Sequence, residues 1–464
     1  MSLGSRLLLL ASALALGLGS PAAPAQGDPP PATTDLRLSA RPAYAGSPTT
    51  LDVELVGGDG APVAGAAVTV ERRSGGVWGV VGTLTTDADG RAEQELVVAR
   101  TVTDNAVRVT YSGDVDHDPA SATTRLELRR RDSRVVVGGR SSVVDGHAVA
   151  VTVRWTTRSG LPVRGSVQLF RSLGGRRWEQ VRTLRTDDRG RARITTSPRL
   201  DSRWRARAVG QDWVAGGWSD VHRVENRPPG EPVRLPAAAP RPRRSLPPQA
   251  RGATDGPHLV VRPVPRRTWA QMTGITWHPG CPVGRSSLRL VRVNYWDYHG
   301  YVRRGEVVAN VDAARAMGAA LADLFDHELP IRAMYRVDRF GWGARSRGGD
   351  DYASMAAGNT SAFNCRDVTG RPGVRSPHSW GRALDLNTWE NPYRSARGIV
   401  PNAWWQGHSH PRVAWRARSH AVVRLMARHG FHWTYGLGDT QHFDHVGSRA
   451  RALVPPRPCD RYCD

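Results

Sequence analysis

The sequence predicts a multidomain chain, with two all-β sandwiches followed by a domain of α+β structure. The chain has 464 residues, enough for two to four domains of about 100–200 residues each. One pattern of short strands occurs twice between residues 35 and 226. From residue 256 onward the composition changes, and this part holds 12 of the 15 histidines. We therefore expect the chemistry of the chain in its C-terminal part.

The overall composition is that of a soluble globular protein. Hydrophobic residues make up 39% of the chain and the mean hydropathy is -0.44. All 65 basic residues are arginine, and the formal net charge is +23. An absence of lysine beside abundant alanine, glycine and proline is typical of biased nucleotide composition. We therefore expect no nucleic-acid partner, although the charge favours contact with anionic polymers such as those of a cell wall.

Residues 1–25 are typical of a secretory signal peptide. Arg6 supplies the positive charge, residues 7–19 form a short apolar run, and residues 23–25 read Ala-Pro-Ala, the small-x-small form of a cleavage site. The run is shorter than the about 20 residues that span a bilayer. No other stretch is long and apolar enough to do so. The sequence predicts a secreted or cell-wall-associated protein with no transmembrane segment in the mature chain.

The cysteine count fits an oxidising compartment. The four residues are Cys281, Cys365, Cys459 and Cys463. An even number in an exported chain predicts disulfides, and four cysteines allow three pairings. A local pair in the C-terminal tail would leave Cys281 with Cys365, but the sequence does not decide between the pairings.

Residues 35–130 and 131–226 are two copies of one repeat, offset by 100 residues. Each copy alternates apolar and polar residues in short runs separated by turn residues, a pattern that predicts a β-sandwich. The segment Thr-Asp-x-x-Gly-Arg-Ala resembles a turn of bacterial immunoglobulin-like domains, and we expect a structural or adhesive role. The identities at this offset are Pro62-Val63 with Pro162-Val163, Gly65 with Gly165, Trp78 with Trp178, Leu84 with Leu184, Thr86-Asp87 with Thr186-Asp187, and Gly90-Arg91-Ala92 with Gly190-Arg191-Ala192.

Residues 227–255 are expected to be a linker. Eight prolines lie between Arg227 and Pro248. Proline fixes φ and cannot donate to a sheet, so this stretch is predicted to be an extended, semi-rigid spacer.

Two helices are predicted in residues 256–464. The first runs from Asn310, its expected cap, to Leu329, with an apolar stripe and Pro330 as its stop. The second runs from Val422 to His429 and ends at Gly430. Both are predicted to be packing elements.

Two segments of this part combine histidine with aspartate. Residues 376–387 read SPHSWGRALDLN, and residues 438–445 read GDTQHFDH. In the first, Ala383, Asp385 and Asn387 share one face of a predicted strand, and the leucines between them face the core. His378 lies on the turn that leads into this strand. A buried aspartate is costly unless it is paired or bound to a metal.

These residues could form a catalytic zinc site. Such sites use three His or carboxylate ligands and leave one position open. His378, Asp385 and His442 supply such a set. Zinc activates water at neutral pH, and a nearby carboxylate is needed to transfer its proton. Asp439, three residues before His442, is suitably placed.

The motifs Ser-x-His-x-x-Gly-x-Ala-x-Asp and Asp-x-x-His-Phe-acidic resemble the signature of the M15 metallopeptidases. These are zinc D-alanyl-D-alanine carboxypeptidases and related peptidoglycan endopeptidases. The resemblance covers roughly residues 275–447. It includes Gly-Cys-Pro at 280–282, Asn-Thr-Ser-Ala-Phe-Asn-Cys-Arg at 359–366 and Asn-Pro-Tyr at 391–393. It implies a hedgehog/D-Ala-D-Ala peptidase-like fold for residues 256–464.

The resemblance also implies roles for single residues. It makes His378, Asp385 and His442 ligands of Zn2+, and it makes Asp439 the general base. An upstream arginine stabilises the oxyanion in this family; Arg366 is the candidate here and Arg336 is the rival. Ser376 is a candidate for binding substrate.

The chain departs from the family pattern at two places. It has Trp433-Thr434-Tyr435-Gly436 where the family often has Trp-Gly-Gly, and Asp444 where Glu is commoner. Neither departure removes a proposed ligand. His445 could replace His442 as a ligand, but the resemblance and the position of Asp439 favour His442. The remaining histidines of this region are expected to be surface or core residues: His408, His410, His420, His429 and His432.

The sequence therefore predicts a secreted zinc peptidase that hydrolyses peptidoglycan stem peptides as a D-alanyl-D-alanine carboxypeptidase. One alternative is an endopeptidase that cuts an L-Ala–D-Glu or cross-bridge bond with the same metal centre. The other alternative is a cell-wall-binding protein that keeps the fold without turnover, although such a protein would not need Asp439.

Overall fold

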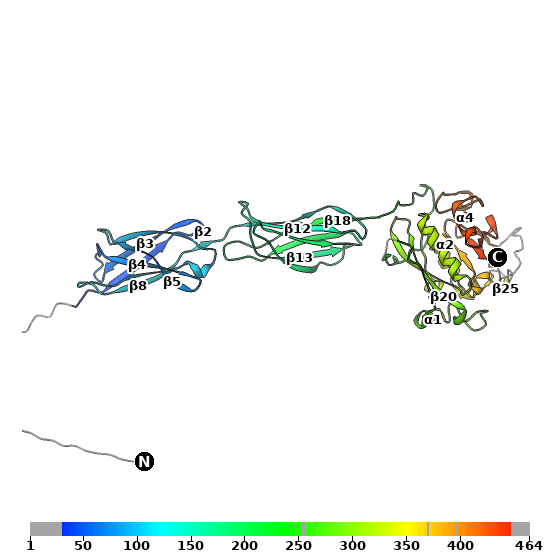
Figure 1. The fold of residues 1–464 in the computed structure, drawn as a ribbon, viewed down its shortest axis with the longest axis horizontal. Coiled ribbons are helices and arrows are strands. Elements are labelled where there is room, and N and C mark those ends of the chain that lie inside the picture. Colours follow the sequence, from blue (N-terminus) through cyan, green and yellow to red (C-terminus); the bar gives the residue numbers. More distant parts are fainter. Residues whose placement is uncertain (1–29, 253–255, 369–370, 396–397, 447–464) are drawn as a thin grey trace, which may run out of the picture.

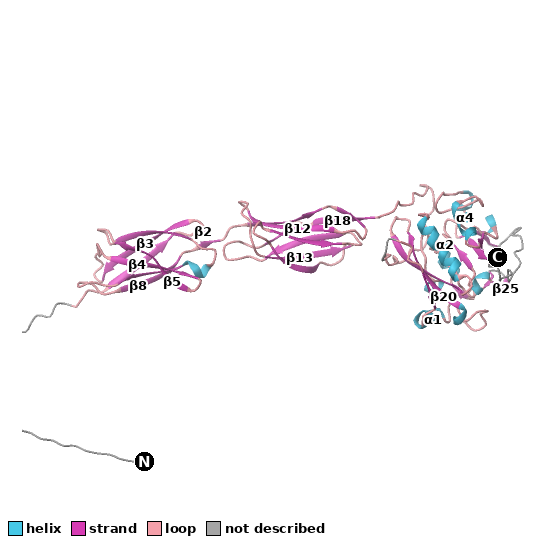
Figure 2. Ribbon diagram, viewed as in Figure 1, coloured by secondary structure: helices cyan, strands magenta, loops and turns pink. Residues whose placement is uncertain are grey.

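The computed structural model of the chain describes residues 30–252, 256–368, 371–395 and 398–446. Three bodies follow one another along its length, and strands predominate in the first two (Figure 1, Figure 2). The predicted signal peptide and the cysteines at 459 and 463 lie outside the described residues. Among the described helices, none is both long and apolar enough to cross a membrane.

The first body is a sandwich of two antiparallel sheets. Alternate residues of both sheets point inward, and Leu51, Val53, Val68 and Val109 meet in one buried core. The order of one sheet is β1 (Thr34–Ala40), β3 (Pro48–Gly57), β6 (Arg91–Val97), and that of the other is β5 (Val77–Thr85), β4 (Ala67–Ser74), β7 (Ala106–Tyr111), β8 (Ala120–Arg125). A short pair, β2 (Ala43–Tyr44) with β9 (Leu128–Arg129), and the 3-10 turn η1 (Val102–Asn105) complete it.

The second body repeats this architecture. Its core contains Trp155 and Trp204, both fully buried. One sheet has the order β10 (Ser133–Gly139), β12 (Val149–Thr157), β15 (Arg191–Thr196); the other has β11 (Ser142–Val144), β18 (His222–Arg227), β16 (Ser202–Ala208), β13 (Ser166–Leu173), β14 (Glu179–Arg185), with β17 (Gly217–Trp218) beside β16. The predicted all-β character of both repeats is confirmed, whereas the immunoglobulin-like assignment stays a prediction.

The residues shared by the two repeats build the same turn twice. The hydroxyl of Thr186 donates to the carbonyl of Val163, as that of Thr86 does to Val63, at 2.7 Å in each case. Gly190 has φ 69°, and a Cβ there would lie 2.3 Å from a backbone oxygen of the neighbouring strand. Only glycine fits such a position, which explains why this residue is the same in both copies.

The third body combines helices with several small sheets. The antiparallel sheet β19 (Val260–Pro263), β20 (Leu288–Trp296), β21 (Val302–Asn310) packs against α2 (Ala314–Asp326). A second sheet has the order β26 (Ala383–Asp385), β30 (His442–His445), β29 (Phe431–His432), and α4 (Ala421–Arg428) lies beside it. One core joins α2, α4 and both sheets, so it holds β26 and β30 rigidly in place.

Shorter elements surround this core. The helices are α1 (Arg266–Met272) and α3 (Asp351–Ala356); the hairpins are β22 (Trp342–Gly343) with β23 (Gly348–Gly349), β24 (Asp367–Val368) with β25 (Arg371–Arg375), and β27 (Tyr393–Ser395) with β28 (Gly398–Val400). The 3-10 turns are η2 (Arg285–Ser287), η3 (Val337–Phe340), η4 (Pro377–Trp380), η5 (Trp404–Gly407) and η6 (Gly436–Gly438).

Both predicted helices exist, with different starts. Asn310 is the last residue of β21 and not the cap of α2, because its amide donates to the carbonyl of Trp380 and joins the strand to the loop before β26. The helix α2 starts four residues later, at Ala314. The helix α4 starts at Ala421, where the side chain of His420 accepts the backbone N–H of Val422.

The proline-rich segment, predicted to be a spacer, lies on the third body. Backbone N–H groups of Gly230, Val233 and Gly252 donate to carbonyls of the loop and strand around residues 298–302, at 2.9–3.0 Å. Leu235 and Ala239 pack beside Trp389, whose indole N–H donates to the carbonyl of Pro240 at 2.7 Å. The sequence did not predict this packing, because a high proline content predicts an extended backbone but does not indicate what that backbone contacts.

Gln249 fixes the end of this segment. Its amide donates to Met334 O at 2.7 Å, and its carbonyl accepts from Tyr295 Oη at 2.5 Å and Met334 N at 2.9 Å. Replacing Gln249 with alanine is expected to destabilise the third body by about 2–3 kcal/mol, because buried donors and acceptors lose their partners. Calorimetric unfolding of the full chain measures this. Gln406→Ala, which removes one bond to Leu437, is the control.

Candidate metal centre

The predicted ligands lie together where two strands meet. Asp385 on β26 is paired in register with His442 on β30, so their side chains leave the same face of the sheet. His378 lies in η4, and Gly381 ends that turn in the left-handed region with φ 69°. A Cβ at Gly381 would lie 2.8 Å from the backbone nitrogen of Asn310. The chain can therefore bend back beside β21 only with glycine here, and this bend places His378 over Asp385.

Three ligand atoms converge from these residues. His378 Nε2 lies 3.1 Å from Asp385 Oδ2, and His442 Nδ1 lies 3.1 Å from Asp385 Oδ1. The two ring nitrogens are themselves 3.1 Å apart. All three side chains are buried. Burial works to raise the pKa of Asp385, but the adjacent imidazoles outweigh it and lower that pKa, so the carboxylate is ionised.

The other nitrogen of each imidazole has an acceptor. His378 Nδ1 lies 2.7 Å from the carbonyl oxygen of Ala362, and His442 Nε2 lies 2.9 Å from Asp444 Oδ1. With a metal bound, such partners would hold the N–H on the far side of each ring, so that Nε2 of His378 and Nδ1 of His442 would face the ion as electron-pair donors. Asp444, at a position where the M15 family more often has glutamate, therefore orients the candidate ligand His442.

The donor set fits a zinc ion. Two imidazole nitrogens, each oriented from behind, and one carboxylate form one of the usual three-residue sets for zinc with an open position. The structure also brings together His278, Cys281 and Cys365. Cys281 and Cys365 form a disulfide, so their sulfurs are not free to bind a metal. The described residues thus offer one suitable group, that of His378, Asp385 and His442.

Asp439 lies beside this group. The residue is buried and pairs through its backbone with Tyr393, and its Oδ1 has no hydrogen-bond partner among the described residues. Burial, ahead of every other influence, raises the pKa of Asp439 to about 7. A buried carboxyl oxygen without a protein partner is costly unless another ligand or a water uses it. Such an oxygen is suited to receive and release a proton.

The structure separates the two candidate arginines. The guanidinium of Arg366 is nearly buried and pairs with Asp351 at 2.7 Å. Burial works to lower the pKa of Arg366, but the charge of Asp351 outweighs it and raises that pKa. The backbone N–H of Arg366 donates to Ser379 Oγ at 3.0 Å, next to His378 in η4. The Nε of Arg366 has no acceptor among the described residues. Arg366 therefore has an unused donor close to the site.

Arg336, the rival, is fully engaged elsewhere. Its guanidinium binds Asp338 through two bonds of 2.9 Å, and also binds Glu306 and Gln271. None of these partners belongs to the metal group. Arg336 therefore holds η3 and the neighbouring sheet together.

The disulfide fixes the residue before Arg366. Cys281 and Cys365 are 84 residues apart in sequence, and Cys365 is fully buried. A cross-link over a loop of this length stabilises a fold by about 4–5 kcal/mol in the chain-entropy model. This pairing was one of the three that the sequence left open.

The remaining predicted residues have other contacts. Ser376 is buried and its backbone N–H donates to the carbonyl of Arg366 at 3.0 Å, so it lies at the edge of the site. The ring of His445 packs against Phe431, and its backbone N–H donates to the carbonyl of Arg382. His445 is thus not brought to the group that contains His442.

Three residues near the site were not among those predicted from the sequence. Ala362 contributes a backbone carbonyl, which any residue type could supply. Asp351 lies on α3 and orients Arg366. The ring of Tyr435 lies 5.3 Å from that of His442 and occupies the region where the family often has Trp-Gly-Gly. This departure from the family pattern was the one clue to Tyr435.

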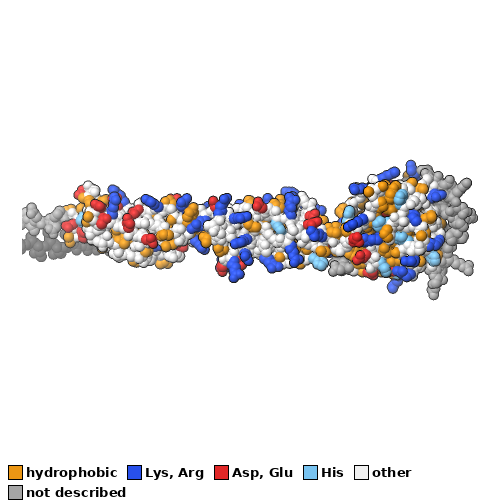
Figure 3. All heavy atoms as spheres, turned by 90° about the horizontal axis from the view of Figure 1, so that it is seen from above, with side chains coloured by type: hydrophobic (Ala, Val, Ile, Leu, Met, Phe, Trp, Pro, Cys, Tyr) orange, Lys and Arg blue, Asp and Glu red, His pale blue; other side chains and the backbone are white. Residues whose placement is uncertain are grey.

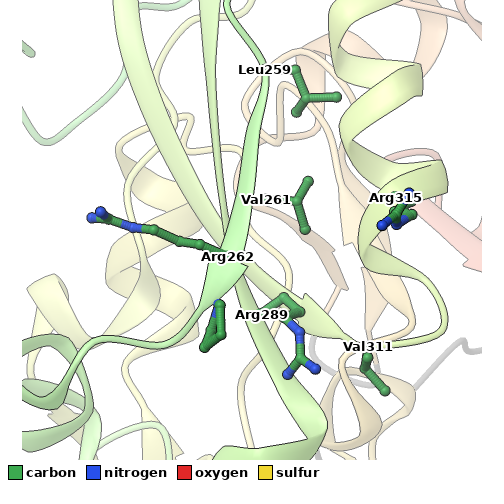
Figure 4. Close-up of a pocket in the computed structure, with 7 residues that line it drawn as sticks. Leu259, Val261, Arg262, Arg289, Val311 and Arg315 are labelled. Atoms are coloured by element: carbon green, nitrogen blue, oxygen red, sulfur yellow. The ribbon is translucent and has the colours of Figure 1, made fainter.

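A separate pocket of about 510 Å³ lies between β19, β20 and the start of α2 (Figure 4). In Figure 4, Arg262 points away from Arg289 and Arg315, so the cations do not converge. The pocket shares no residue with the metal group. Its lining residues are Leu259, Val261, Arg262, Pro263, Arg289, Val311 and Arg315.

One comparison with known proteins covers the region of the candidate site. Residues 369–445 match the model of the M15 peptidase family described as D-alanyl-D-alanine carboxypeptidase. The matched range contains all three candidate ligands and Asp439. The match supports a peptidase domain of this family in the third body. No curated protein matches the chain.

Solved structures give a more distant likeness. Salmonella alpha-2-macroglobulin reacted with methylamine aligns with 57% of this chain at 13% identity and a TM-score of 0.19, and Escherichia coli alpha-2-macroglobulin activated by porcine elastase aligns with 56% at 12% identity and a TM-score of 0.19. The chain covers 18% and 26% of those proteins.

Proposed function

We propose that the chain is a secreted or cell-wall-associated zinc peptidase that hydrolyses peptidoglycan stem peptides as a D-alanyl-D-alanine carboxypeptidase. One observation carries the proposal: the three candidate ligand side chains share a buried site with Asp439, a carboxylate that binds no protein group through Oδ1 among the described residues. The family match over residues 369–445 supports the reaction class. The Ser-x-His motif supports peptidoglycan stem peptides as the substrate. The predicted signal peptide supports a secreted or cell-wall location.

His378, Asp385 and His442 would hold the ion. Zinc in this site would supply Lewis acidity toward water and the scissile carbonyl. Asp439 accepts the proton of the attacking water at Oδ1 and delivers it to the leaving amine. A carboxyl with a pKa of about 7 can do both near neutral pH, since it binds and releases protons readily there.

Arg366 donates to the oxygen that becomes negative during attack. Replacing Arg366 with lysine is expected to lower kcat by about 10²–10³-fold, because a positioned donor to the oxyanion is lost while the charge stays. Steady-state kinetics on a defined stem peptide measures this. Arg336→Lys is the matched control, for which we expect lower stability and kcat within a few-fold of the parent. Equal losses of kcat in both variants would contradict the assignment.

Mass spectrometry of a defined pentapeptide stem tests the proposed function. We expect loss of the terminal D-alanine with zinc-loaded protein, no reaction after chelation, and recovery when zinc is returned. Cleavage inside the stem or at a cross-bridge would instead identify an endopeptidase. Unchanged peptides with zinc bound would indicate a wall-binding protein without turnover.

A further inference from the structure

The outer face of the second sandwich carries arginines stacked on aromatic rings. We call this set the stacked arginine face; its residues are Phe170, Trp178, Arg203, Arg205, Arg207 and Trp218. Three of them alternate along β16, where the residues between them point into the core. The rings come from β13, β17 and the turn before β14. The set therefore lies on one side of one sheet.

Arg205 is at the centre of this set. Its guanidinium carbon lies 4.5 Å from the ring of Trp178 and 4.4 Å from that of Trp218. Trp218 also lies 5.8 Å from Arg207 and 5.1 Å from Phe170. Stacking of this kind holds a guanidinium in one orientation and leaves its edge to bind a ligand.

The positive charge of this face is not neutralised by the protein. No carboxylate of the described residues forms an ion pair with Arg203, Arg205 or Arg207. Trp218 is 48% exposed, which is unusual for so large an apolar side chain. Oriented cations beside an exposed indole are a combination that suits an external anion.

The first sandwich provides an internal comparison. Arg108 on β7 occupies the place of Arg205, and it stacks on Trp78 at 4.7 Å. Its cross-strand neighbour, however, is Glu71, which pairs with it at 2.7 Å. The corresponding neighbour of Arg205 is Phe170. The stacked arginine is therefore neutralised by a carboxylate in the first repeat, whereas in the second repeat it keeps its positive charge.

Two further positions of this face also differ between the two sandwiches, and the differences again favour anion binding by the second. The register places Thr110 and Ser121 of the first sandwich where the second has Arg207 and Trp218. The second repeat thus has an additional cation and an additional exposed ring on this face.

The net charges of the two repeats are opposite. Residues 131–226 contain 19 arginines and nine acidic residues, a net +10, whereas residues 35–130 contain ten arginines and 14 acidic residues, a net −4. Nucleotide bias acts on both copies equally, so it does not explain this contrast. On the face shown in Figure 3, blue side chains gather over the second sandwich and are mixed with red over the first.

We propose that the stacked arginine face binds an anionic wall polymer built of sugars and phosphodiesters. Guanidinium groups bind phosphate oxygens through paired hydrogen bonds, and exposed indoles pack against sugar rings. Regularly spaced phosphates on a flexible chain can meet Arg203, Arg205 and Arg207 together. This binding would hold the chain on the wall and is independent of hydrolysis in the third body.

Equilibrium binding of the full chain to purified, glycosylated poly(glycerol phosphate) tests this proposal. The test variant combines Phe170→Glu, Arg207→Thr and Trp218→Ser, which installs the residues of the first repeat and changes the charge by −2. The control is Arg193→Glu on the opposite sheet, which also installs the residue of the first repeat, Glu93, and also changes the charge by −2. We expect at least tenfold weaker binding for the test variant and a change within twofold for the control.

Several outcomes would overturn the proposal. Equal losses in both variants would mean that net charge alone drives binding, and no loss in the test variant would mean that the face is not used. Single-stranded DNA binding as tightly as the polymer would indicate a different partner. Arg207→Thr alone, at an exposed position, is expected to weaken binding about threefold and keeps the test valid if the triple variant misfolds. Hydrolysis of a free stem peptide is expected to stay unchanged in all variants.

Discussion

Replacing His442 with alanine is expected to reduce hydrolysis of a stem peptide by on the order of 10³-fold or more, because zinc would lose one of three protein ligands. The same change at His445, three residues later, is expected to keep activity within a few-fold. The structure gives the reason: His442 Nδ1 lies 3.1 Å from Asp385, whereas the ring of His445 packs on Phe431. The pair of variants therefore separates a ligand from a neighbouring histidine on the same strand.

Metal content is the second readout for these two variants. Purified His442→Ala protein is expected to contain much less than one zinc per chain after dialysis, and His445→Ala protein is expected to retain it. Circular dichroism and thermal unfolding show whether each variant is folded. Full zinc content and activity in folded His442→Ala protein would exclude this residue as a ligand and favour His445.

The grouping of the candidate ligands was predictable from sequence because metal binding depends on residue types. Histidine and aspartate bind metals through few atoms, and their spacing around a short strand restricts where those atoms lie. The sequence therefore predicted His378, Asp385 and His442, and the structure brings them together. The acceptor behind His378 was not predictable, because it is the backbone carbonyl of Ala362 and depends on the fold alone.

The same distinction holds for the fold. The repeat was visible because its turn requires particular side chains, such as Thr86 and Gly90 and their counterparts 100 residues later. The predicted start of α2 was wrong because Asn310 is a good helix cap in isolation, but here its amide serves a tertiary contact with Trp380. The contacts of the proline-rich segment with the third body were missed because most of them use a backbone N–H or C=O group on at least one side, and such a group leaves no pattern in the sequence.

The net charge of the whole chain conceals a difference between the two repeats. The use of arginine in place of lysine does indicate biased nucleotide composition. Such a bias explains which basic residue is used, but it does not explain how many basic residues there are relative to acidic ones. The two repeats share the bias and differ in net charge, from −4 to +10. The contrast between the two copies lies in the amino-acid sequence itself, and it marks the second sandwich as the unusual one.

Replacing Asp439 with asparagine is expected to lower kcat by about 10²–10⁴-fold while zinc stays bound. Asparagine keeps the size and polarity of the side chain but cannot accept the proton of water and pass it to the leaving amine. Asp439 is three residues from His442, and its Oδ1 contacts no protein group among the described residues, so the change removes no interaction that holds a ligand. A loss of turnover without a loss of metal is the signature of a general base.

Three measurements on the same preparation make this prediction decisive. Zinc per chain is expected to equal that of the parent, KM is expected to change little, and kcat carries the loss, because proton transfer occurs after the substrate binds. Asp326→Asn, at an exposed position on α2, is the matched control and is expected to behave as the parent. If Asp439→Asn lost zinc together with activity, Asp439 would be a ligand or its support, and the proton transfer would belong to another group. If it kept both, the carboxylate would have no part in turnover, and its presence would no longer distinguish an enzyme from a wall-binding protein at this site.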